Sequence, residues 1–581
     1  MNFRLLGPDR IDEELKSVIE QIAAGKPPRD IESRVVEVKE EPGRRTGHSI
    51  VPGSTTNEDA AVYLLDELAC MANTPGSGAL ILGVADDGRV IGTELNAEWL
   101  RHRLYELSDS KLTIHVQEAE LDGTRLLILR PPESIEPIRS RDRRIRWRVA
   151  DNCVEVDAAT WSQGYMMRLG FDWSDQPSGY RIDDVNLIAL EIARDFLKAA
   201  SNDPNALELA SSSDEDLLRR LNLVKPDGHL TNAGALLFIA TPEPGLDYIR
   251  RDYSGADSSM RVNTKGPLLN QLAAVLNAAA AANRILHVPV GPVHIQLRAI
   301  PELAIREAVV NGITHRDWQS AAPTVVEHQA DSLVVTSPGG FVSGVNPENI
   351  LTYPSTPRYR ALASAMSALK LAEREGIGVD RMVREMLALG HSLPDIAEIP
   401  GPQVRVALVG GVPDKLWMEF LRALAPDTVA QELDLLLLLN LLVQRGWLDV
   451  RSAAPVLQKS ELETRAAIQR LELASIAEQP VVTLVDGVPD AEPPAWRFSN
   501  AARRHLGSKL EHLLNSQNRQ SFITDWATHR QRVSSTEVSD LLDLSASHAN
   551  TILTNLADEG YLVPIRKSRR GRGFYYLPAA E

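Results

Sequence analysis

Apolar and polar residues follow two different periods along the chain, and segments of the two kinds alternate. From Asp59 to Met71 the apolar residues recur at helical spacing, and a second long helix is predicted from Glu302 to His315. Ala79 to Val84 is an unbroken apolar run of strand length that ends at a DDG turn. In Ile31 to Glu40 valines alternate with charged residues, as on the edge of a sheet. The pattern therefore predicts an α/β protein built from several domains.

Breaks in this pattern predict six parts. They are residues 1–30, a helical appendage; 31–165, a first α/β domain; 166–290, a connecting α/β region; 291–415, a second domain in which helix and strand alternate; and 428–500 and 505–581, two helical units, each with a helix pair. Apart from the duplication of the last two units, we find no fixed-period repeat and no low-complexity tract.

The composition agrees with several globular domains. The chain has 581 residues, and domains of about 100–200 residues each would number three to five. With 44% hydrophobic and 24% charged residues, the chain is neither disordered nor fibrous. The longest apolar run, Leu433 to Val443, is shorter than the ~20 residues of a membrane span, and the first residues lack an apolar signal core. We therefore expect a cytoplasmic protein with no membrane partner.

The two cysteines favour the same compartment. Cys70 and Cys153 lie far apart and form no CxxC pair. Their number and spacing exclude a disulfide framework or a zinc knuckle and fit a reducing cytosol.

The net charge of −16, from 62 Lys and Arg against 78 Asp and Glu, at first argues against a nucleic-acid partner. The positive charge is concentrated, however. Six arginines crowd one short segment: Arg139, Arg141, Arg143, Arg144, Arg146 and Arg148. If this segment is a strand, Arg144, Arg146 and Arg148 lie on one face, and Ile145 and Trp147 lie on the other. Such a face would bind phosphates; the alternative is a strand whose arginines pair with surface glutamates.

A possible metal site lies near the start of the first domain. Glu32 and Glu37 are five residues apart, and Lys39 follows on the same strand face as Glu37. Converging carboxylates can hold a divalent ion that activates water against a phosphodiester, and a lysine can offset phosphate charge. The alternative is a solvated pair between Glu37 and Lys39.

These residues belong to a longer pattern that resembles the AlbA-type core of the Schlafen family. Its motifs are ExxxxEFK, then A-x-A-N-T-x-G-G, then a strand ending in I-G-V-x-D-G. The matching positions are Glu32, Glu37 and Lys39; Ala69, Ala72, Asn73, Thr74 and Gly78; and Gly83, Val84, Asp86, Asp87 and Gly88. The resemblance implies a nucleic-acid-binding α+β core. By analogy with Schlafen nucleases, which cut tRNA or other RNA, it implies a metal site at Glu32, Glu37 and Asp86, with Asp87 as the rival to Asp86. Val38 replaces the usual Phe, and the loop at 43–57 differs.

A second set of polar residues lies on the helix from Glu302. Glu307, Asn311 and His315 are at i, i+4 and i+8, and therefore share one face. A carboxylate that orients water and an amide that binds Mg²⁺ suit a nucleotide triphosphate site, whereas the alternative is a polar stripe on a surface helix.

The order of this helix, an SPGG turn and a GxGxxR turn resembles a divergent form of the histidine-kinase-like (GHKL) ATPase domain. That form follows a Schlafen core in many bacterial proteins described as RecG-like or as transcriptional regulators. The resemblance implies an α/β sandwich that binds ATP, with Glu307 as the base and Asn311 as the Mg²⁺ ligand. The glycines that would approach the nucleotide are Gly339, Gly340, Gly376 and Gly378. No DxGxG aspartate is present, which leaves hydrolysis open, and the absence of a Walker lysine loop disfavours a helicase motor.

The last unit has the order helix, turn, helix, strand, basic tip and strand, and resembles the winged-helix domains of bacterial repressors. Ser547, His548 and Asn550 would face a DNA groove, and Thr551 or Thr554 could add backbone contacts. The basic tip holds Arg566, Lys567, Arg569, Arg570 and Arg572. The alternative is a dimerisation or docking module. The preceding unit, 428–500, is also winged-helix-like, but it is less basic, and a structural role is favoured for it.

Together these patterns predict a bacterial protein that binds ATP and nucleic acid, with a nucleotide state that controls how it engages DNA or RNA, in transcriptional regulation or anti-phage defence. One alternative is a Schlafen-type endonuclease that uses Mg²⁺ or Mn²⁺ to cut tRNA, other RNA or single-stranded DNA. Another is an assembly scaffold with inactive sites. A homo-oligomer, a dimer or larger, is expected.

Overall fold

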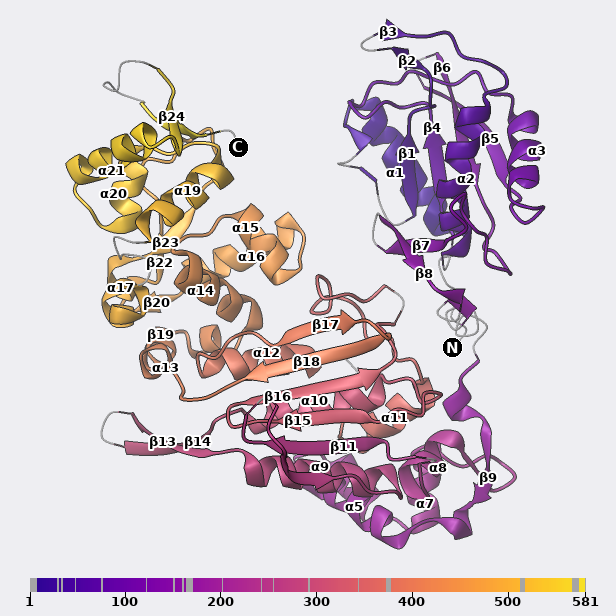
Figure 1. The fold of residues 1–581 in the computed structure, drawn as a ribbon, viewed down its shortest axis with the longest axis vertical. Helices are drawn as coiled ribbons and strands as arrows, with labels where there is room; N and C mark the ends of the chain where they lie inside the picture. The colour runs from indigo at the N-terminus through magenta and orange to yellow at the C-terminus, as the bar shows by residue number, and fades with distance from the viewer. Residues whose placement is uncertain are drawn as a thin grey trace. The chain divides into compact units, whose positions relative to one another are not determined.

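The computed structural model describes residues 8–579 apart from 29–30, 33–34, 47–48, 75–76, 122, 150–151, 159–160, 163–170, 201, 242, 254, 291–292, 343, 373–377, 512–517 and 567–573. It divides into two compact units, Met1–Trp173 and Ser174–Glu581, each coloured by residue number in Figure 1. Each unit is described by itself.

A four-stranded mixed sheet forms the centre of the N-terminal unit. Its order is β1 (Val36–Lys39), β4 (Ala79–Leu82), β6 (Thr124–Arg130) and β5 (His115–Leu121). β1 runs parallel to β4, and the other neighbours are antiparallel. β4 and β6 read as continuous apolar runs because both of their faces are covered.

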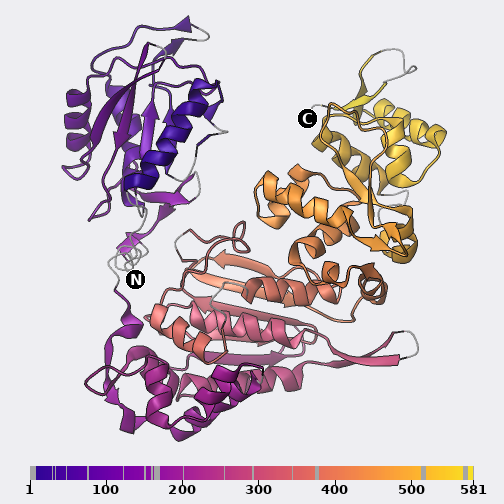
Figure 2. The ribbon, with the colours of Figure 1, turned by 180° about the vertical axis from the view of Figure 1, so that it is seen from behind.

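Helices cover both faces of this sheet. Ala79 and Ile81 pack with α1 (Pro8–Ala23), whereas Leu80 and Leu82 pack with α2 (Glu58–Asn73) and α3 (Ala97–Leu107). Figure 2 shows α1 lying along the sheet. The prediction of an N-terminal appendage was therefore wrong, because α1 buries Leu15, Val18 and Ile22 in the same core.

A hairpin of β7 (Ile145–Val149) and β8 (Asn152–Val156) packs against α2. A disulfide joins Cys70 of α2 to Cys153 of β8. The sequence analysis had favoured reduced cysteines, because the two lie 83 residues apart. The hairpin folds back over the end of α2 and brings their Cα atoms to 6.1 Å.

A six-stranded sheet dominates the first part of the C-terminal unit. Its order is β12 (Ser258–Val262), β11 (Leu246–Arg251), β15 (Thr324–His328), β16 (Ser332–Pro338), β18 (Gln403–Val409) and β17 (Asp395–Ile399). The helices α9 (Leu268–Ala282), α10 (Glu302–Thr314), α11 (Arg360–Ala368) and α12 (Gly378–Ala388) lie along one face of it (Figures 1 and 2). This sheet with one helical layer is an α/β sandwich.

The predicted boundary near residue 290 does not separate two domains, since β11 and β12 precede it and belong to this sheet. The hairpin β13 (Ile285–Val290) and β14 (Val293–Arg298) occupies the boundary itself. Ahead of the sheet, β9 (Pro177–Arg181) and β10 (His229–Thr231) pair beside α5 (Leu187–Ala199), α6 (Pro204–Ala210), α7 (Asp214–Arg220) and α8 (Asn232–Phe238). The segment LTNAGALLFIA, expected to contain a buried strand, forms α8 instead, with Thr231 as its N-cap.

After α13 (Lys415–Arg422) come two smaller units. The first C-terminal unit contains α14 (Leu433–Arg445), α15 (Val450–Leu457), α16 (Glu461–Glu472), β20 (Ser475–Ile476), β21 (Gln479–Pro480), β22 (Val482–Leu484) and β23 (Trp496–Phe498). The second C-terminal unit follows α17 (Asn500–Leu506) and contains α19 (Arg519–Arg530), α20 (Ser535–Leu542), α21 (Ala546–Asp558), β24 (Leu562–Pro564) and β25 (Tyr576–Pro578).

The first and second C-terminal units, which both belong to Ser174–Glu581, share a core and buried ion pairs. The rings of Trp447 and Trp526, one from each unit, meet edge to face with centroids 4.8 Å apart. Arg530 pairs with Asp449 at 2.9 Å, and both side chains are at most 4% exposed. A shared apolar core and a buried ion pair therefore join the two units.

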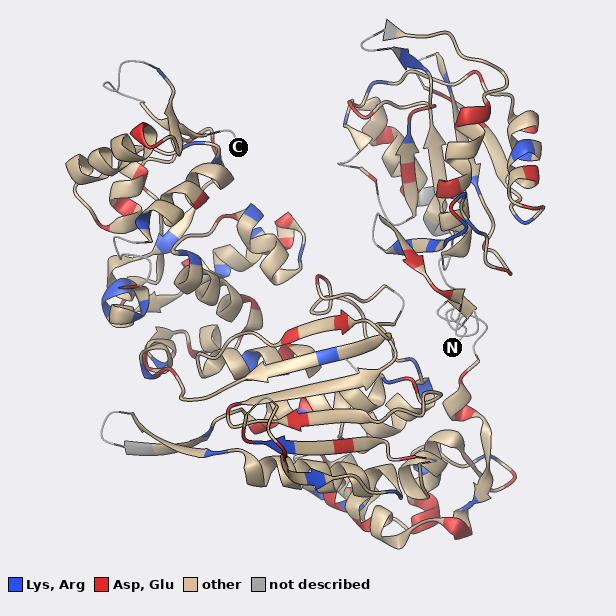
Figure 3. Ribbon diagram, viewed as in Figure 1, with Lys and Arg blue, Asp and Glu red and all other residues tan. Residues whose placement is uncertain are grey.

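Charged residues of both signs are spread over both units (Figure 3), with basic residues gathered on β7 and at the end of α17. In the part of the chain that the structure describes, no helix is both long and apolar enough to span a bilayer.

Candidate functional sites

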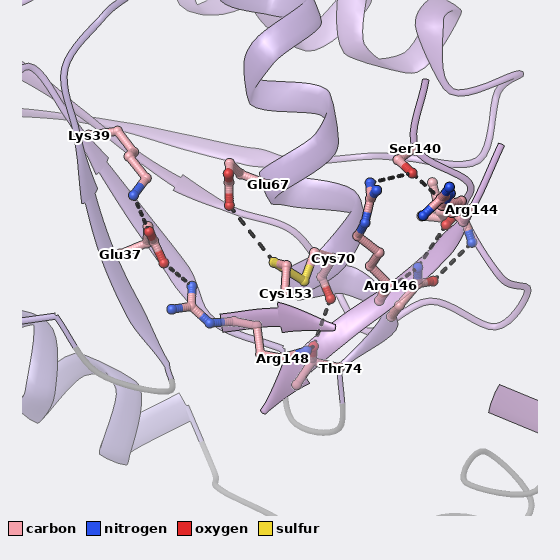
Figure 4. Close-up of a disulfide and its surroundings, with 12 residues drawn as sticks. Glu37, Lys39, Glu67, Cys70, Thr74, Ser140, Arg144, Arg146, Arg148 and Cys153 are labelled. Atoms are coloured by element: carbon pink, nitrogen blue, oxygen red, sulfur yellow. Dashed lines mark hydrogen bonds and ion pairs between the residues drawn. A yellow bond between two sulfur atoms is a disulfide. The ribbon is translucent and has the colours of Figure 1, made fainter. Parts of the chain in front are cut away.

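The first site surrounds the buried carboxylate of Glu37 on β1, and we call Glu32, Glu37, Lys39 and Arg148 the Glu37 cluster (Figure 4). The Lys39 ammonium forms an ion pair with Glu37 and lies 3.5 Å from Glu32 Oε1. The Val38 amide donates to the same oxygen of Glu32 at 3.0 Å. Strand alternation places Glu37 and Lys39 on one face, as predicted from the sequence, and Glu32, which precedes β1, meets them through Val38 and Lys39.

The fourth member comes from β7. The Arg148 side chain is 1% exposed and forms an ion pair with Glu37 Oε2. Its backbone N–H donates to Thr74 Oγ1 at 2.7 Å, at the end of α2. Figure 4 shows Lys39 and Arg148 approaching Glu37 from two sides. Glu37 is thus neutralised by two cations, a pairing that strand alternation alone did not reveal.

Burial and charge shift the pKa values around this cluster. Burial raises the pKa of Glu32 despite the Val38 hydrogen bond. Although burial opposes it, the hydrogen bond and charge of Glu37 raise the pKa of Lys39 above its ordinary value. Burial, then the charge of Glu37, raises the pKa of Glu67, whose Oε2 lies 3.9 Å from Cys153 Sγ. The sequence analysis missed Glu67, which lies on the buried side of α2.

The residues as placed do not fit the expected metal ion. Among the described residues, no group of three or more His, Cys, Asp and Glu side chains could hold one. Both oxygens of Glu37 already face cations, and Asp86 is exposed. The rival Asp87 accepts the Arg89 Nε–H at 2.9 Å within its own turn. The predicted site at Glu32, Glu37 and Asp86 is therefore not assembled in this arrangement.

The alternating arginines of β7 have acidic partners. Arg144 pairs with Glu155 at 2.8 Å, and Arg146 pairs with Asp142. Hydrogen bonds from Ser140 and Arg146 lower the pKa of Asp142 to about 2. Ile145 and Trp147 are buried on the other face, as predicted. The geometry is that of the alternative interpretation, an arginine strand paired with acids, and phosphate binding by Arg144 and Arg146 stays a prediction.

The other arginines of this segment also have partners. Arg141 pairs with Asp66 of α2 at 2.9 Å, and Arg139 donates to the backbone oxygen of Arg143 at 2.8 Å. The Arg141 pair holds the segment against α2, whereas the Arg139 bond lies within the segment itself.

The second site, which we call the glycine pocket, is a cavity of about 160 Å³ between α10, α12 and the turn after β16. Its polar lining includes Asn311, His315 and Ser337, and the backbones of Gly339, Gly340 and Gly378. Its apolar lining includes Val335, Phe341, Met382, Ile396 and Val404. The structure therefore brings Asn311, His315 and three of the predicted glycines together; the fourth, Gly376, lies outside the described residues.

The glycines are needed for close approach. A Cβ on Gly378 would lie 2.9 Å from Glu307 Oε2 and 3.3 Å from Asn311 Nδ2. Gly339 has φ +94°, a left-handed conformation that favours glycine, and a Cβ there would lie 3.0 Å from the Asp317 N. At Gly340 a Cβ would lie 2.7 Å from the Glu398 carboxylate.

Glu307, the predicted base, lies beside the pocket rather than open to it. Its side chain is 2% exposed, and Oε1 accepts from Arg381 Nη1 at 3.0 Å. An arginine bonded to this carboxylate competes with a water molecule for its lone pairs. Arg381 is the arginine of the GxGxxR motif, but the motif did not show that this arginine pairs with Glu307.

The predicted His315 is neutral at pH 7. Burial, then the charge of Arg358, lowers its pKa to about 4. Arg358 donates to the Gly340 backbone oxygen at 2.8 Å, and so holds the turn that forms one edge of the pocket. A neutral imidazole can accept or donate one hydrogen bond without adding charge to the pocket.

The loop that lines the pocket with Val345, Ile350 and Tyr353, and so forms part of its wall, is held by the first C-terminal unit. Gln458, after α15, accepts from the Leu351 N–H at 2.8 Å and donates from Nε2 to the Pro347 oxygen at 2.7 Å. Its backbone oxygen accepts from Thr352 Oγ1 at 3.0 Å. Val379 lines the pocket and also packs against the core that contains α14.

The third candidate surface lies on α21. Ser545 caps this helix by accepting the His548 N–H. Ser547, His548 and Asn550 are exposed on its first turns, whereas Ala549, Leu553 and Leu556 are buried. Arg566 is exposed near the ring of Phe574, at 5.9 Å. The remaining residues of the basic tip, Lys567, Arg569, Arg570 and Arg572, lie outside the described residues.

Comparisons with known proteins identify two families along the chain. Residues 32–157 match the family described as "Schlafen, AlbA_2". Residues 322–408 match the family described as "Putative ATP-dependent DNA helicase recG C-terminal". These matches confirm the resemblances of the first domain and of the ATPase-like domain that were predicted from the sequence.

Among solved structures, the chain is similar to the DIP2311 protein from Corynebacterium diphtheriae. The two are 31% identical, the match covers 98% of this chain and 100% of that chain, and the TM-score is 0.62. No curated protein matches the chain.

Proposed function

Because the chain belongs to the family of the DIP2311 protein and joins a Schlafen AlbA_2 domain to a RecG C-terminal-type domain, we propose that it binds ATP and nucleic acid, and that its nucleotide state controls nucleic-acid engagement. The observation that carries this proposal is the contact of Gln458 with the wall of the glycine pocket. Transcriptional control and defence against foreign nucleic acid are its two candidate settings.

The glycine pocket suits an adenine nucleotide. Its apolar wall fits a base, and its glycine turns let backbone N–H groups approach phosphates. Asn311, which lines the pocket, offers an amide oxygen to the Mg²⁺ that accompanies ATP. Bound ATP supplies binding energy that favours whichever arrangement of the pocket wall holds it better.

Binding rather than rapid hydrolysis follows from the surroundings of Glu307. Its ion pair with Arg381 occupies an oxygen that a water-activating base needs. We therefore expect the protein to act as a nucleotide-dependent switch with little turnover.

Nucleic-acid binding is assigned to the second C-terminal unit, which we propose is a winged helix with α21 as recognition helix. Its exposed side chains Ser547, His548 and Asn550 are of the kinds that contact bases in a major groove. The five basic residues from Arg566 to Arg572 supply phosphate contacts. We assign the first C-terminal unit a coupling role.

The metal-dependent endonuclease and the inactive scaffold are the alternatives. The arrangement around Glu37 does not favour the first, since two cations already occupy that carboxylate. The exposed polar side chains of α21 and the open glycine pocket do not favour the second.

The coupling is tested by measuring duplex DNA affinity by fluorescence anisotropy with and without Mg·ATP. Coupling free energies between two sites typically correspond to about 5- to 150-fold changes in affinity. We expect a shift of at least about fivefold for the wild type. Gln458→Ala should retain calorimetric ATP binding and DNA binding but lose most of this shift, because it removes two contacts between the pocket wall and the first C-terminal unit.

Two control variants separate the possible outcomes. Gln469→Ala, on an exposed position of α16, should leave the shift unchanged. Asn311→Ala should abolish the shift by removing ATP binding itself. A wild type that binds ATP but shows the same DNA affinity with and without it would overturn the proposal, and so would a Gln458→Ala variant with a full shift.

A further inference from the structure

We propose that the Cys70–Cys153 disulfide closes the Glu37 cluster to divalent cations by seating Arg148 on Glu37, and that reduction of the disulfide opens it. The inference concerns the N-terminal unit alone and does not depend on the coupling proposed above. Its first support is that the disulfide and the ion pair lie on the same short hairpin.

Strand pairing places the two features opposite each other. In the β7–β8 hairpin, Arg148 is the register partner of Cys153. Cys153 is covalently fixed to Cys70, a residue of α2 that is 1% exposed. The bond therefore fixes the strand position from which Arg148 reaches Glu37 (Figure 4).

The charges explain why this position excludes a metal. Glu32 and Glu37 carry two negative charges, and Lys39 and Arg148 carry two positive charges, so the closed cluster is neutral. A divalent cation brought into a neutral buried cluster would lose its water without gaining a net attraction. Arg148 thus supplies the positive charge that a metal ion would otherwise bring to Glu37.

Removal of Arg148 leaves the cluster with a net negative charge. Without Arg148, Glu32 and Glu37 would face Lys39 alone, with a net charge of −1. The neighbouring Glu67 adds one further negative charge in either state when it is ionised. Carboxylate oxygens with this net charge are suitable ligands for Mg²⁺ or Mn²⁺. Glu67 lies next to the Glu37 cluster and is not part of the Schlafen sequence pattern.

The disulfide is accessible to a reductant from one side. Cys153 is partly exposed, whereas Cys70 is fully buried. A thiolate of a dithiol reductant attacks the Cys153 sulfur, and the second thiol of the reductant then displaces Cys153 from the mixed disulfide. Two electrons and two protons pass to Cys70 and Cys153, which become thiols, and the reductant becomes a disulfide.

After reduction only non-covalent contacts hold the hairpin to α2. Among them, the Asn73 side chain donates to the Arg146 oxygen at 3.0 Å, and Thr74 accepts the Arg148 N–H at 2.7 Å. Hydrogen bonds of this kind open and close locally, whereas the disulfide does not. Arg148 can then leave Glu37 when a cation competes for the carboxylate.

The test titrates Mn²⁺ into the full-length protein and follows free Mn²⁺ by electron paramagnetic resonance. Three samples are compared: oxidised protein, protein reduced with dithiothreitol and desalted without oxygen, and the Cys70→Ser/Cys153→Ser variant. The reduced and serine forms should bind Mn²⁺ at least about tenfold more tightly than the oxidised protein. Changes to the groups that contact metal ligands typically alter metal affinity by this factor. Glu37→Gln in the reduced state should abolish the gain.

Arg148→Met provides a second route to the open state. In the oxidised protein it should raise Mn²⁺ affinity as reduction does, and Arg144→Met, an exposed arginine on the same strand, should not. Equal Mn²⁺ affinity in the oxidised and reduced wild type would overturn the inference, and this comparison needs no variant. An oxidised Arg148→Met protein that is folded, as judged by circular dichroism, but shows no gain would overturn it as well.

Discussion

At the scale of single residues, the glycine pocket leaves no space for a side chain where α12 begins. Gly378 lies against both polar residues predicted for nucleotide binding, since a Cβ there would be 2.9 Å from Glu307 Oε2. No left-handed backbone is involved, because Gly378 is not among the glycines with positive φ. The requirement is therefore one of space, and a methyl group tests it.

Gly378→Ala should lower ATP affinity by at least about tenfold, which corresponds to about 1.4 kcal/mol of binding free energy. The added methyl group would displace Asn311 or move α12 away from α10. Isothermal titration with Mg·ATP measures the effect. The matched control is Gly179→Ala, where a Cβ meets nothing within 4 Å; equal affinities of the two variants would contradict the assignment.

Residues that act through local spacing could be predicted from the sequence, and those that act through distant pairing could not. Asn311 and His315 follow from the helical period, and Glu37 and Lys39 follow from strand alternation. The partner of Glu307, however, is Arg381, 74 residues away. Arg148 was predicted on a strand face together with Arg144 and Arg146, but of the three it alone is buried, against Glu37. Periodicity identifies faces without showing what covers them.

At the scale of elements, α2 and α10 were predicted within one or two residues of their ends. Asn57 caps α2, and α10 begins directly after Pro301. The segment that forms α8 was expected to contain a strand, because a short apolar run fits either a buried strand or a buried helix. All the residues from Ala233 to Phe238 are buried. Nothing in their pattern shows a polar face that would reveal the helical period.

The second C-terminal unit allows a prediction that concerns α21 alone. Replacing His548 and Asn550 by Ala should lower duplex DNA affinity by about 1–3 kcal/mol for each base contact that is lost. Both residues are exposed at the start of α21, where recognition helices meet base edges. Fluorescence anisotropy at a fixed salt concentration measures the loss.

The control for this prediction is Asn555→Ala, an exposed position further along α21. Its effect should be smaller, because the far end of a recognition helix points away from the bases. If all of these substitutions leave the affinity unchanged, α21 does not contact DNA, and the docking alternative for this unit gains support.

At the scale of the whole molecule, the net charge of −16 is the sum of interspersed charges rather than of separate acidic and basic blocks (Figure 3). Many of the arginines on β7 and near the C-terminus are engaged within the protein, as in the pairs of Arg144, Arg146 and Arg530. The segment from Arg566 to Arg572 keeps its high density of positive charge. Nonspecific attraction to DNA should therefore depend mainly on that segment.

The division into two compact units predicts two unfolding transitions in scanning calorimetry. The disulfide closes a loop of 83 residues within the N-terminal unit. By chain entropy, such a loop closure stabilises a protein by about 4–5 kcal/mol. Reduction should therefore lower one melting temperature by roughly 10 °C.

The second transition should respond to a different addition. Mg·ATP should raise the melting temperature of the C-terminal unit and leave that of the N-terminal unit unchanged, because a ligand stabilises only the state that binds it. Cys70→Ser/Cys153→Ser should reproduce the effect of the reductant. A single transition, or two transitions that both shift with the reductant, would show that the units unfold together.

The junction between the two C-terminal units has a mechanical consequence. Buried pairs such as Arg530 with Asp449, together with the packed rings of Trp447 and Trp526, make the two units turn as one body. The pocket wall touches this body at Gln458, close to one end, and α21 lies in the other unit. If bound ATP moves this wall, as proposed above, the movement would reach α21 through Gln458 and the core that the two units share, and would change how α21 meets a DNA groove.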